Sequence, residues 1–343
     1  MTSSTGRVRL LAFVAFTAVT LTGSVAYVAD AYADRAGAVR DTGTDTGADA
    51  ATVAAGPHVV FRNTAAGPDE GHVALVPVDA PGGARAITPA VCDRVYATRV
   101  RAVCLAAHAT AVSRTYRVRL LRPDWTVDRE LDGFSGLSSR TRLARDSARV
   151  TTTAFVYGDS YNSPGRFSTR TTISDVAGDG RVELEDFEFR VDGRVNRRAD
   201  RNFWGVTFTT DGDTFYATGA SDGRTWLVRG SVSARTLTAL HQDVECPSLS
   251  PDGTRVAYKR HGDLPDGQWR LAVLDLRTGR ETVLAETRSV DDQAEWLDDE
   301  RVLYGLRTGA IGEQRSDVWV ADADGGGSPE VLIENAWSPA VVR

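Results

Sequence analysis

The sequence predicts an all-β fold for most of the chain, and three observations support this prediction. Short segments rich in β-branched and aromatic residues are bounded by Gly, Pro and Asp, as in residues 269–276 (WRLAVLDL) and 317–320 (DVWV). No long stretch shows the apolar period of an amphipathic helix. A local pattern of strand, acidic turn and strand recurs along the chain. This recurrence indicates a repeat architecture built from small antiparallel sheets.

The repeated pattern is clearest in three segments, at residues 204–216 (WGVTFTTDGDTFY), 246–258 (CPSLSPDGTRVAY) and 293–304 (QAEWLDDERVLY). The Asp-Gly pairs at 211–212 and 252–253 are 41 residues apart. Four-stranded propeller blades repeat at about 40 to 50 residues. Asp-Gly also supplies the positive φ values of a tight hairpin turn. Each segment is therefore predicted to form the inner hairpin of a blade, with an outer pair of strands following it.

We predict a β-propeller of six blades, at residues 58–88, 91–133, 137–190, 202–240, 244–286 and 290–334. A seventh blade would result if the long 137–190 region divided differently. The final segment, 337–342 (WSPAVV), has the features of an opening strand with no blade after it. We expect it to complete the first blade, because this closes the ring and removes two exposed sheet edges.

One blade resembles a known repeat. Residues 250–258 (SPDGTRVAY) resemble the core of the WD40-like repeat in the propeller of TolB and its relatives, and residues 274–279 (LDLRTG) fit the same unit. The resemblance, to TolB-like exported proteins of actinobacteria, implies a propeller with an extracytoplasmic binding role and supplies no catalytic residues. The chain departs from TolB because a linker stands where TolB has a small α/β domain, so TolB's partner contacts are not carried over.

An uncharged apolar run at residues 10–29 lies near the N-terminus. Arg7 and Arg9 precede this run, and Asp30 follows it directly. Basic residues before the run and an acidic residue after it predict an N-terminus in the cytoplasm and the remainder outside. The run has the length of about 20 residues that a helix needs to span a bilayer.

The same region also contains motifs of a cleaved export signal, SVA at 24–26 and AYA at 31–33. We therefore predict that residues 1–33 are either a transmembrane anchor or a signal peptide, which gives a membrane-anchored or a secreted protein. Residues 34–56 are small, polar and without period, so they are predicted to be a disordered linker. The propeller then spans residues 57–343.

Composition limits the class of partner. The chain has 40 basic and 46 acidic residues, a net charge of −6, and no dense basic stripe of the kind that binds nucleic acid. Lys259 is the only lysine, so lysine-based covalent chemistry has a single candidate. We expect a protein or a cell-envelope ligand as the partner, and contact with the membrane only through residues 10–29.

No catalytic constellation stands out. The chain lacks HExxH and CxxC motifs, and its five histidines are scattered, at His58, His72, His108, His241 and His261. Residues 158–160 (GDS) match a short hydrolase motif in a strand-and-loop context. We predict a non-catalytic binding protein. The alternative is a hydrolase or lyase with its site in the central channel, since propellers host such sites.

Residues 175–186 (DVAGDGRVELED) partly match a calcium-binding loop, with Asp175, Asp179 and Asp186 at ligand positions 1, 5 and 12. Ala177 removes the ligand at position 3, and strand-like segments stand where calcium loops have helices. A hairpin with an Asp-Gly turn is the interpretation that we favour. The sequence thus predicts no cofactor, with calcium as the alternative.

Two further clusters leave alternatives open. Cys92 and Cys104 are 12 residues apart within one predicted blade, and a disulfide between them is permitted outside the cytoplasm. Cys246 is predicted to be a buried thiol. The acidic residues between 291 and 300 are interpreted as a solvated turn, and a site for a cation or a basic partner at an open end of the ring is the alternative.

Overall fold

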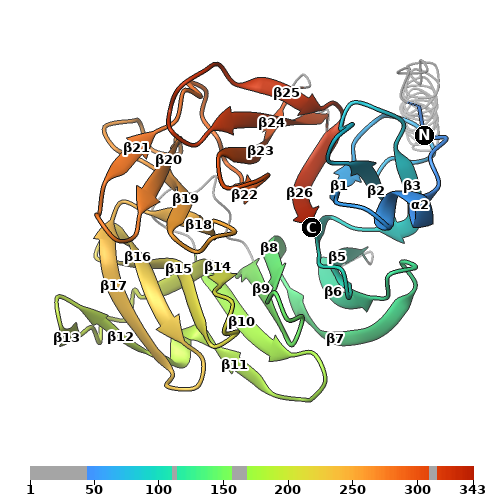
Figure 1. Ribbon diagram of the computed structural model, residues 1–343. Helices are drawn as coiled ribbons and strands as arrows, with labels where there is room; N and C mark the ends of the chain where they lie inside the picture. The colour runs from blue at the N-terminus through green and yellow to red at the C-terminus, as the bar shows by residue number, and fades with distance from the viewer. Residues whose placement is uncertain (1–44, 110–113, 157–167, 309–314) are drawn as a thin grey trace, which may run out of the picture. The chain divides into compact units, whose positions relative to one another are not determined.

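The computed structural model of the chain consists of six sheets arranged as blades around a central channel (Figure 1). The structure describes residues 45–109, 114–156, 168–308 and 315–343. The blades belong to a unit made of residues 45–65 and 69–343. The predicted all-β, six-bladed propeller is confirmed.

The first three blades have four strands each, ordered from the channel outward. Blade 1 contains β26 (Ala336–Val342), β1 (His58–Asn63), β2 (His72–Pro77) and β3 (Ala86–Val91). Blade 2 contains β4 (Arg94–Ala97), β5 (Ala102–Ala109), β6 (Arg114–Leu121) and β7 (Val127–Ser135). Blade 3 contains β8 (Leu137–Leu143), β9 (Arg149–Phe155), β10 (Thr169–Asp175) and β11 (Arg181–Glu183).

The remaining blades follow the same plan. Blade 4 contains β14 (Asn202–Phe208), β15 (Thr214–Ser221), β16 (Arg224–Ser231) and β17 (Thr236–Gln242). Blade 5 contains β18 (Glu245–Leu249), β19 (Arg255–Arg260), β20 (Arg270–Asp275) and β21 (Glu281–Val283). Blade 6 contains β22 (Glu295–Trp296), β23 (Arg301–Arg307), β24 (Ser316–Asp322) and β25 (Glu330–Ile333).

The last strand of the chain closes the ring. β26 pairs antiparallel with β1, and Val342 lies opposite His58 in the register. The six inner strands contact one another in the order β26, β4, β8, β14, β18, β22 and again β26. The prediction for residues 337–342 is therefore confirmed, and the inner edge of blade 1 is covered by the chain's own C-terminal strand.

The Asp-Gly turns of the inner hairpins form, with positive φ at the glycines but not at Asp211 or Asp252. In blade 5, Asp252 Oδ1 accepts a hydrogen bond from the backbone N–H of Thr254 (2.9 Å), and Gly253 has φ +74°. In blade 4, Asp211 Oδ1 accepts from the backbone N–H of Thr214 (2.8 Å), and Gly212 has φ +68°. Glycine adopts this left-handed conformation without the steric penalty that other residues meet there.

Blade 4 differs from the prediction because it carries two further strands. β12 (Glu188–Val191) pairs in parallel with β17, and β13 (Arg194–Val195) pairs with β12. The prediction placed residues 187–190 in blade 3. Phe189 is fully buried in the core of blade 4, with its ring 5.3 Å from that of Phe203 and 6.0 Å from that of Trp226. This aromatic packing assigns the segment to blade 4. A short 3-10 helix, η1 (Leu184–Asp186), precedes it.

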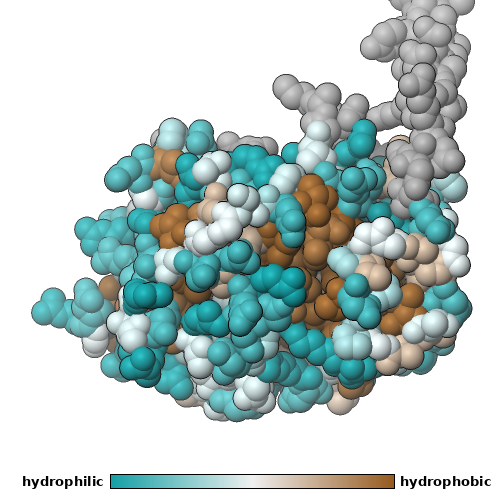
Figure 2. All heavy atoms as spheres, turned by 45° about the horizontal axis from the view of Figure 1, so that its top comes forward, coloured by the Kyte–Doolittle hydropathy of each residue, from teal (hydrophilic) through white to brown (hydrophobic). Residues whose placement is uncertain are grey.

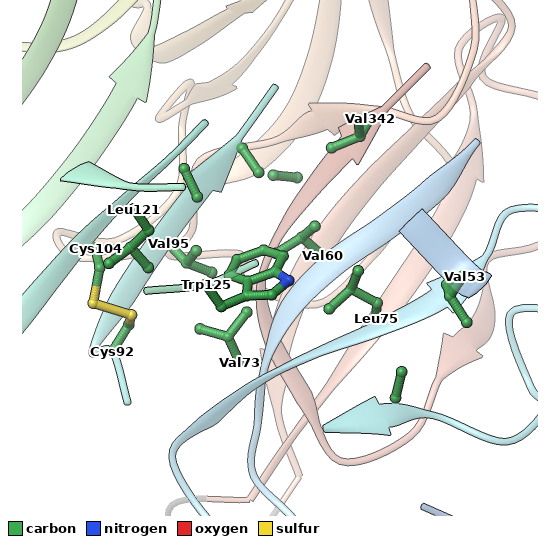
Figure 3. Packing of buried hydrophobic residues seen from close by; sticks show 14 of the residues in the cluster. Val53, Val60, Val73, Leu75, Cys92, Val95, Cys104, Leu121, Trp125 and Val342 are labelled. Carbon is green, nitrogen blue, oxygen red and sulfur yellow. A yellow bond between two sulfur atoms is a disulfide. The ribbon is translucent and has the colours of Figure 1, made fainter. Parts of the chain in front are cut away.

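Apolar side chains between blades 1 and 2 form one of the core clusters (Figure 3). Val60 and Leu75 of blade 1 pack with Val95 and Leu121 of blade 2, and all four are nearly inaccessible to solvent. Trp125, in the turn between β6 and β7, belongs to the same cluster. Such burial is the main favourable contribution to folding, so the inter-blade cores hold the ring together.

The linker predicted at residues 34–56 differs from the structure in its C-terminal part. Helix α2 (Ala50–Ala54) begins after Asp49, whose side chain caps the helix by accepting from the backbone N–H of Thr52 (2.8 Å). Val53 is buried in the cluster between blades 1 and 2. The polar composition of this segment gave no indication that Val53 packs into the core. Residues 34–44 of the predicted linker lie outside the described residues.

The predicted anchor or signal peptide at residues 1–33 also lies outside the described residues, as do residues 158–160. In the part of the chain that the structure describes, no helix combines the length and apolarity needed to cross a membrane.

Hydrophilic side chains cover most of the face drawn in Figure 2, and apolar side chains form smaller patches between them. Among the residues that the structure describes, exposed large apolar side chains come from all six blades, at Val91, Val100, Val127, Leu137, Val156, Leu240, Val283 and Val331. Scattered single apolar residues are normal on protein surfaces. The charged and polar groups of the ring are therefore the better candidates for a specific site.

Candidate binding site at the centre of the ring

A cavity of about 300 Å³ opens where the six inner strands end. It is lined by the last residue of each inner strand: Ala97, Leu143, Phe208, Leu249, Trp296 and Val342. These residues make part of the cavity lining apolar. We call the cavity, with the arginines around it described below, the mouth recess.

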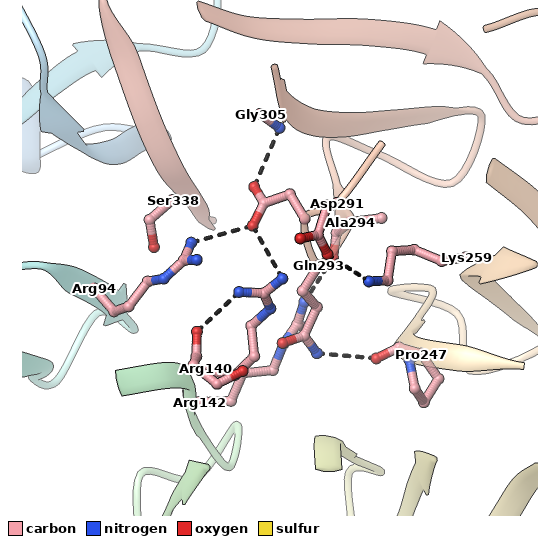
Figure 4. A network of polar contacts seen from close by, with 12 residues as sticks. Arg94, Arg140, Arg142, Pro247, Lys259, Asp291, Gln293, Ala294, Gly305 and Ser338 are labelled. Carbon is pink, nitrogen blue, oxygen red and sulfur yellow. Dashed lines mark hydrogen bonds and ion pairs between the residues drawn. The ribbon is translucent and has the colours of Figure 1, made fainter. Parts of the chain in front are cut away.

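Ion pairs cross the channel behind this cavity (Figure 4). Arg94 of blade 2 and Arg140 of blade 3 point to the same carboxylate, that of Asp292 in blade 6, at 3.1 and 3.5 Å. The carboxylate is 2% exposed and also accepts a hydrogen bond from the backbone N–H of Gly305 (3.2 Å). We call this set the channel brace, because it links blades 2, 3 and 6 across the ring.

A second buried pair lies closer to the mouth. Arg142 of blade 3 contacts Glu295 of blade 6 at 2.9 Å, and both side chains are less than a tenth exposed. The same guanidinium donates to Ser248 Oγ of blade 5 (3.0 Å) and to the carbonyl of Ala294 (2.7 Å). Burial raises the pKa of Glu295, and the charge of Arg142 opposes this shift. Arg142 therefore ties three blades together at the recess.

Tyr96 of blade 2 completes this side of the recess. The guanidinium carbon of Arg142 lies 5.1 Å from the centre of the Tyr96 ring, within range of a cation–π contact. Burial, together with the charge of Glu295, raises the pKa of Tyr96 to about 12. The phenol therefore stays protonated and neutral at physiological pH.

Lys259 belongs to the same polar interior. Its side chain is fully buried, its Nζ lies 2.8 Å from Asp291 Oδ1, and it lies 4.1 Å from the centre of the Trp269 ring. Glu245 faces it across the strand pair β18–β19 and accepts a hydrogen bond from Trp269 Nε1 (2.9 Å). The only lysine of the chain thus lies among two carboxylates and an indole.

Three arginines surround the recess, each on a segment that follows an inner strand. Arg99 Nε donates to the main-chain oxygen of Arg343, the last residue of the sequence, and Arg343 Nη2 donates to the carbonyl of Trp296. Arg145 Nη2 donates to the carbonyls of Ser250 (3.2 Å) and Pro251 (2.7 Å). Among the described residues, Arg145 and Arg343 form no ion pair with an acidic side chain, and the backbone carbonyls that hold them do not neutralise their charge.

The structure does not bring the three candidate calcium ligands into one cluster. Asp175 ends β10 and pairs with Arg149 at 3.4 Å, Asp179 lies in the β10–β11 turn and pairs with Arg129 at 2.9 Å, and Asp186 ends η1. The segment forms the β10–β11 hairpin that was the favoured interpretation. Within the described ranges, no group of three or more His, Cys, Asp or Glu side chains is arranged to hold a metal ion.

The acidic segment 291–300 is only in part the solvated turn that was predicted. Asp298 caps the β22–β23 turn by accepting from the backbone N–H groups of Glu300 (2.9 Å) and Arg301 (2.8 Å). Asp292 and Glu295, in contrast, are buried in the channel. The prediction of solvation was wrong for these two residues, because their counter-charges come from blades 2 and 3, far away in the sequence.

Cys92 and Cys104 form a disulfide, with their Cα atoms 5.4 Å apart. It joins the connection between blades 1 and 2 to strand β5 (Figure 3). Cys246 is a buried thiol, as predicted. His58 and His72 each contact a backbone carbonyl through Nδ1 at 2.8 Å, and neither belongs to the channel brace.

Comparisons with solved structures identify the chain as similar to other propellers. TolB from Acinetobacter baumannii is similar over 84% of this chain and 66% of its own, with a TM-score of 0.58 and 14% identity. A chain of the nidogen/laminin complex is similar over 83% of this chain and 98% of its own, with a TM-score of 0.50 and 12% identity. A puromycin-hydrolyzing peptidase from Mycobacterium tuberculosis covers 84% of this chain and 54% of its own, with a TM-score of 0.45 and 14% identity.

These similarities concern the fold. The chain spans about two thirds of the length of the TolB structure. No family model and no curated protein matches the sequence. The structure thus resembles the propeller domains of TolB and other six-bladed propellers.

Proposed function

We propose that the chain is a non-catalytic, extracytoplasmic binding protein that presents the mouth recess to a protein or cell-envelope ligand. One observation carries the proposal: all six inner strands end at one cavity, while the channel behind it is filled by buried ion pairs. A recess with fixed walls at the mouth of a filled channel is suited to binding a group that projects from the surface of a partner. Concave sites of a few hundred Å³ are the usual form of binding sites.

Crosslinking from inside and outside the recess tests this proposal. Val100 lines the recess and is 54% exposed, whereas Val331 lies on the outer strand β25 and is 39% exposed. A photo-crosslinking amino acid is placed at either position of the full chain in its native cells. We expect one reproducible partner from position 100 and not from position 331. Equal products from both positions, or none from position 100, would contradict the proposal.

The proposed location rests on two features. Disulfides persist in oxidising compartments outside the cytoplasm, and Cys92–Cys104 is one. Basic residues before the apolar run at 10–29 and an acidic residue after it give the same orientation. Cysteine alkylation in intact cells, before and after reduction, checks this: Cys92 and Cys104 should react only after reduction. Fractionation of cells and medium then distinguishes an anchored chain from a secreted one.

The alternative, a hydrolase or lyase with its site in the channel, makes a different prediction. Substrate turnover by the purified chain that is lost when channel residues such as Lys259 or Asp291 are changed, with the fold intact, would favour the enzyme and overturn the binding proposal.

A further inference from the structure

We infer that the mouth recess is a carboxylate-binding site, and that its ligand is an acidic peptide segment of the partner. This inference rests on the proposed function and names the chemical class of the ligand. It depends on the charge of the recess, the hydrogen-bond donors that remain there, and the size and polarity of the cavity.

The charge of the recess is strongly positive. Its lining contains four arginines, Arg99, Arg142, Arg145 and Arg343, and one acidic residue, Glu295. Arg142 is the one that pairs with Glu295. Arg145 and Arg343 bind backbone carbonyls, which do not neutralise their charges. A cavity with low-dielectric walls and an excess of one sign of charge concentrates counter-ions, here anions.

The three arginines around the recess, Arg99, Arg145 and Arg343, which we call the rim arginines, also keep unused hydrogen-bond donors. In the described part of the chain, Arg145 and Arg343 donate only from Nη2, and Arg99 only from Nε. A guanidinium offers a planar fork of N–H donors that matches a carboxylate in a bidentate manner. The carbonyl contacts hold each group in position while the other donors stay free. The rim is therefore pre-organised for an incoming anion.

The cavity favours a carboxylate on a carbon chain over a bare phosphate. Its lining includes apolar residues such as Phe208, Leu249 and Trp296, and its volume is about 300 Å³. That space accommodates one or two acidic side chains with their methylene groups. Glu295 provides an internal example, since its carboxylate is held by Arg142 in the same cavity. The geometry thus fits Asp or Glu side chains of a peptide.

Fluorescence anisotropy with a defined probe tests the inference on the full chain in mild detergent. The probe is a fluorescein-labelled peptide of alternating Glu and Gly, with a Gln–Gly peptide as the neutral control. We expect the Glu peptide to bind and the R145Q/R343Q variant to weaken its binding at least about tenfold, because two charge-assisted contacts are lost. Raising the salt from about 50 to about 300 mM should also weaken binding.

A matched control removes the same charge elsewhere. R190Q/R229Q changes two exposed arginines of blade 4 and should leave the affinity unchanged. The inference is overturned if the Gln peptide binds equally well, or if R145Q/R343Q binds the Glu peptide like the wild type. If inorganic phosphate displaces the probe at lower concentrations than the unlabelled Glu peptide does, the site binds phosphate groups in preference to carboxylates and the inference is wrong.

The crosslink from position 100 separates the two proposals. If that crosslink persists in R145Q/R343Q while the Glu peptide never binds, the recess is a binding site and the inferred ligand class is wrong. If the crosslink is absent from the start, the proposed function fails.

Discussion

Replacing Asp292 by Asn should destabilise the ring by about 3 kcal/mol, the cost of breaking a buried ion pair from one side. The change keeps a side-chain oxygen for the backbone N–H of Gly305 but removes the negative charge between Arg94 and Arg140. These two arginines have side chains only 15% and 7% exposed, so water cannot replace the lost carboxylate. Urea unfolding followed by tryptophan fluorescence measures the loss.

Two further variants make this test specific. D179N changes an Asp–Arg pair whose carboxylate is 99% exposed, and it should cost less than about 1 kcal/mol. R140Q/D292N removes a positive charge together with the negative one, so its loss should be smaller than the sum of the two single losses. If D292N is as stable as D179N, the channel brace does not hold the blades together and the reasoning is refuted.

Three other changes address stability elsewhere in the ring. C92A/C104A opens a crosslink with a sequence separation of 12 residues and should lower the free energy of unfolding by about 3 kcal/mol; equal melting of both proteins under oxidising conditions would contradict this. Burial raises the pKa of Glu185 from 4.5 to about 7, so the protonated carboxyl stabilises the fold below about pH 4.5, and this stabilisation is lost as the pH rises through 7. The free energy of unfolding of E185Q should therefore rise relative to that of the wild type between about pH 5 and 8. A difference that stays constant over this range would refute the pKa shift. G305A places a Cβ 2.5 Å from an indole ring of β26 and should cost about 1 to 3 kcal/mol, whereas the nearest atom to a Cβ in the control G178A is 3.9 Å away; similar unfolding of the two variants would exclude the clash.

The features that the sequence predicts correctly are those encoded locally. The turn at Asp252 and Gly253 follows from two adjacent residues, and the inner hairpins follow from alternating apolar strands around such turns. The closing role of residues 337–342 follows from a lone strand at the end of a repeat, because an unpaired inner edge is unfavourable. The number of blades follows from the spacing of the repeated segments along the sequence.

The channel brace and the mouth recess, in contrast, depend on contacts between distant residues. Arg140 and Asp292 are charged residues on different blades, and a local pattern assigns both to the surface. The rim arginines are also ordinary loop residues in the sequence. One signal was available: polar residues at the inner-strand positions, such as Arg142 in β8 and Glu295 in β22, stand where apolar residues were expected. Opposite charges at such positions predict pairing across a channel.

The brace has a consequence for binding that distinguishes pre-organisation from simple electrostatics. Asp292 does not line the recess, and D292N removes one negative charge near it. Electrostatic attraction alone then predicts tighter binding of the Glu peptide. The walls of the recess come from six blades, however, and loss of the brace frees blade 6 to shift against blades 2 and 3, which separates the rim arginines. We therefore expect weaker binding by D292N under conditions where the protein is still folded, and tighter binding would show that the recess does not depend on the brace.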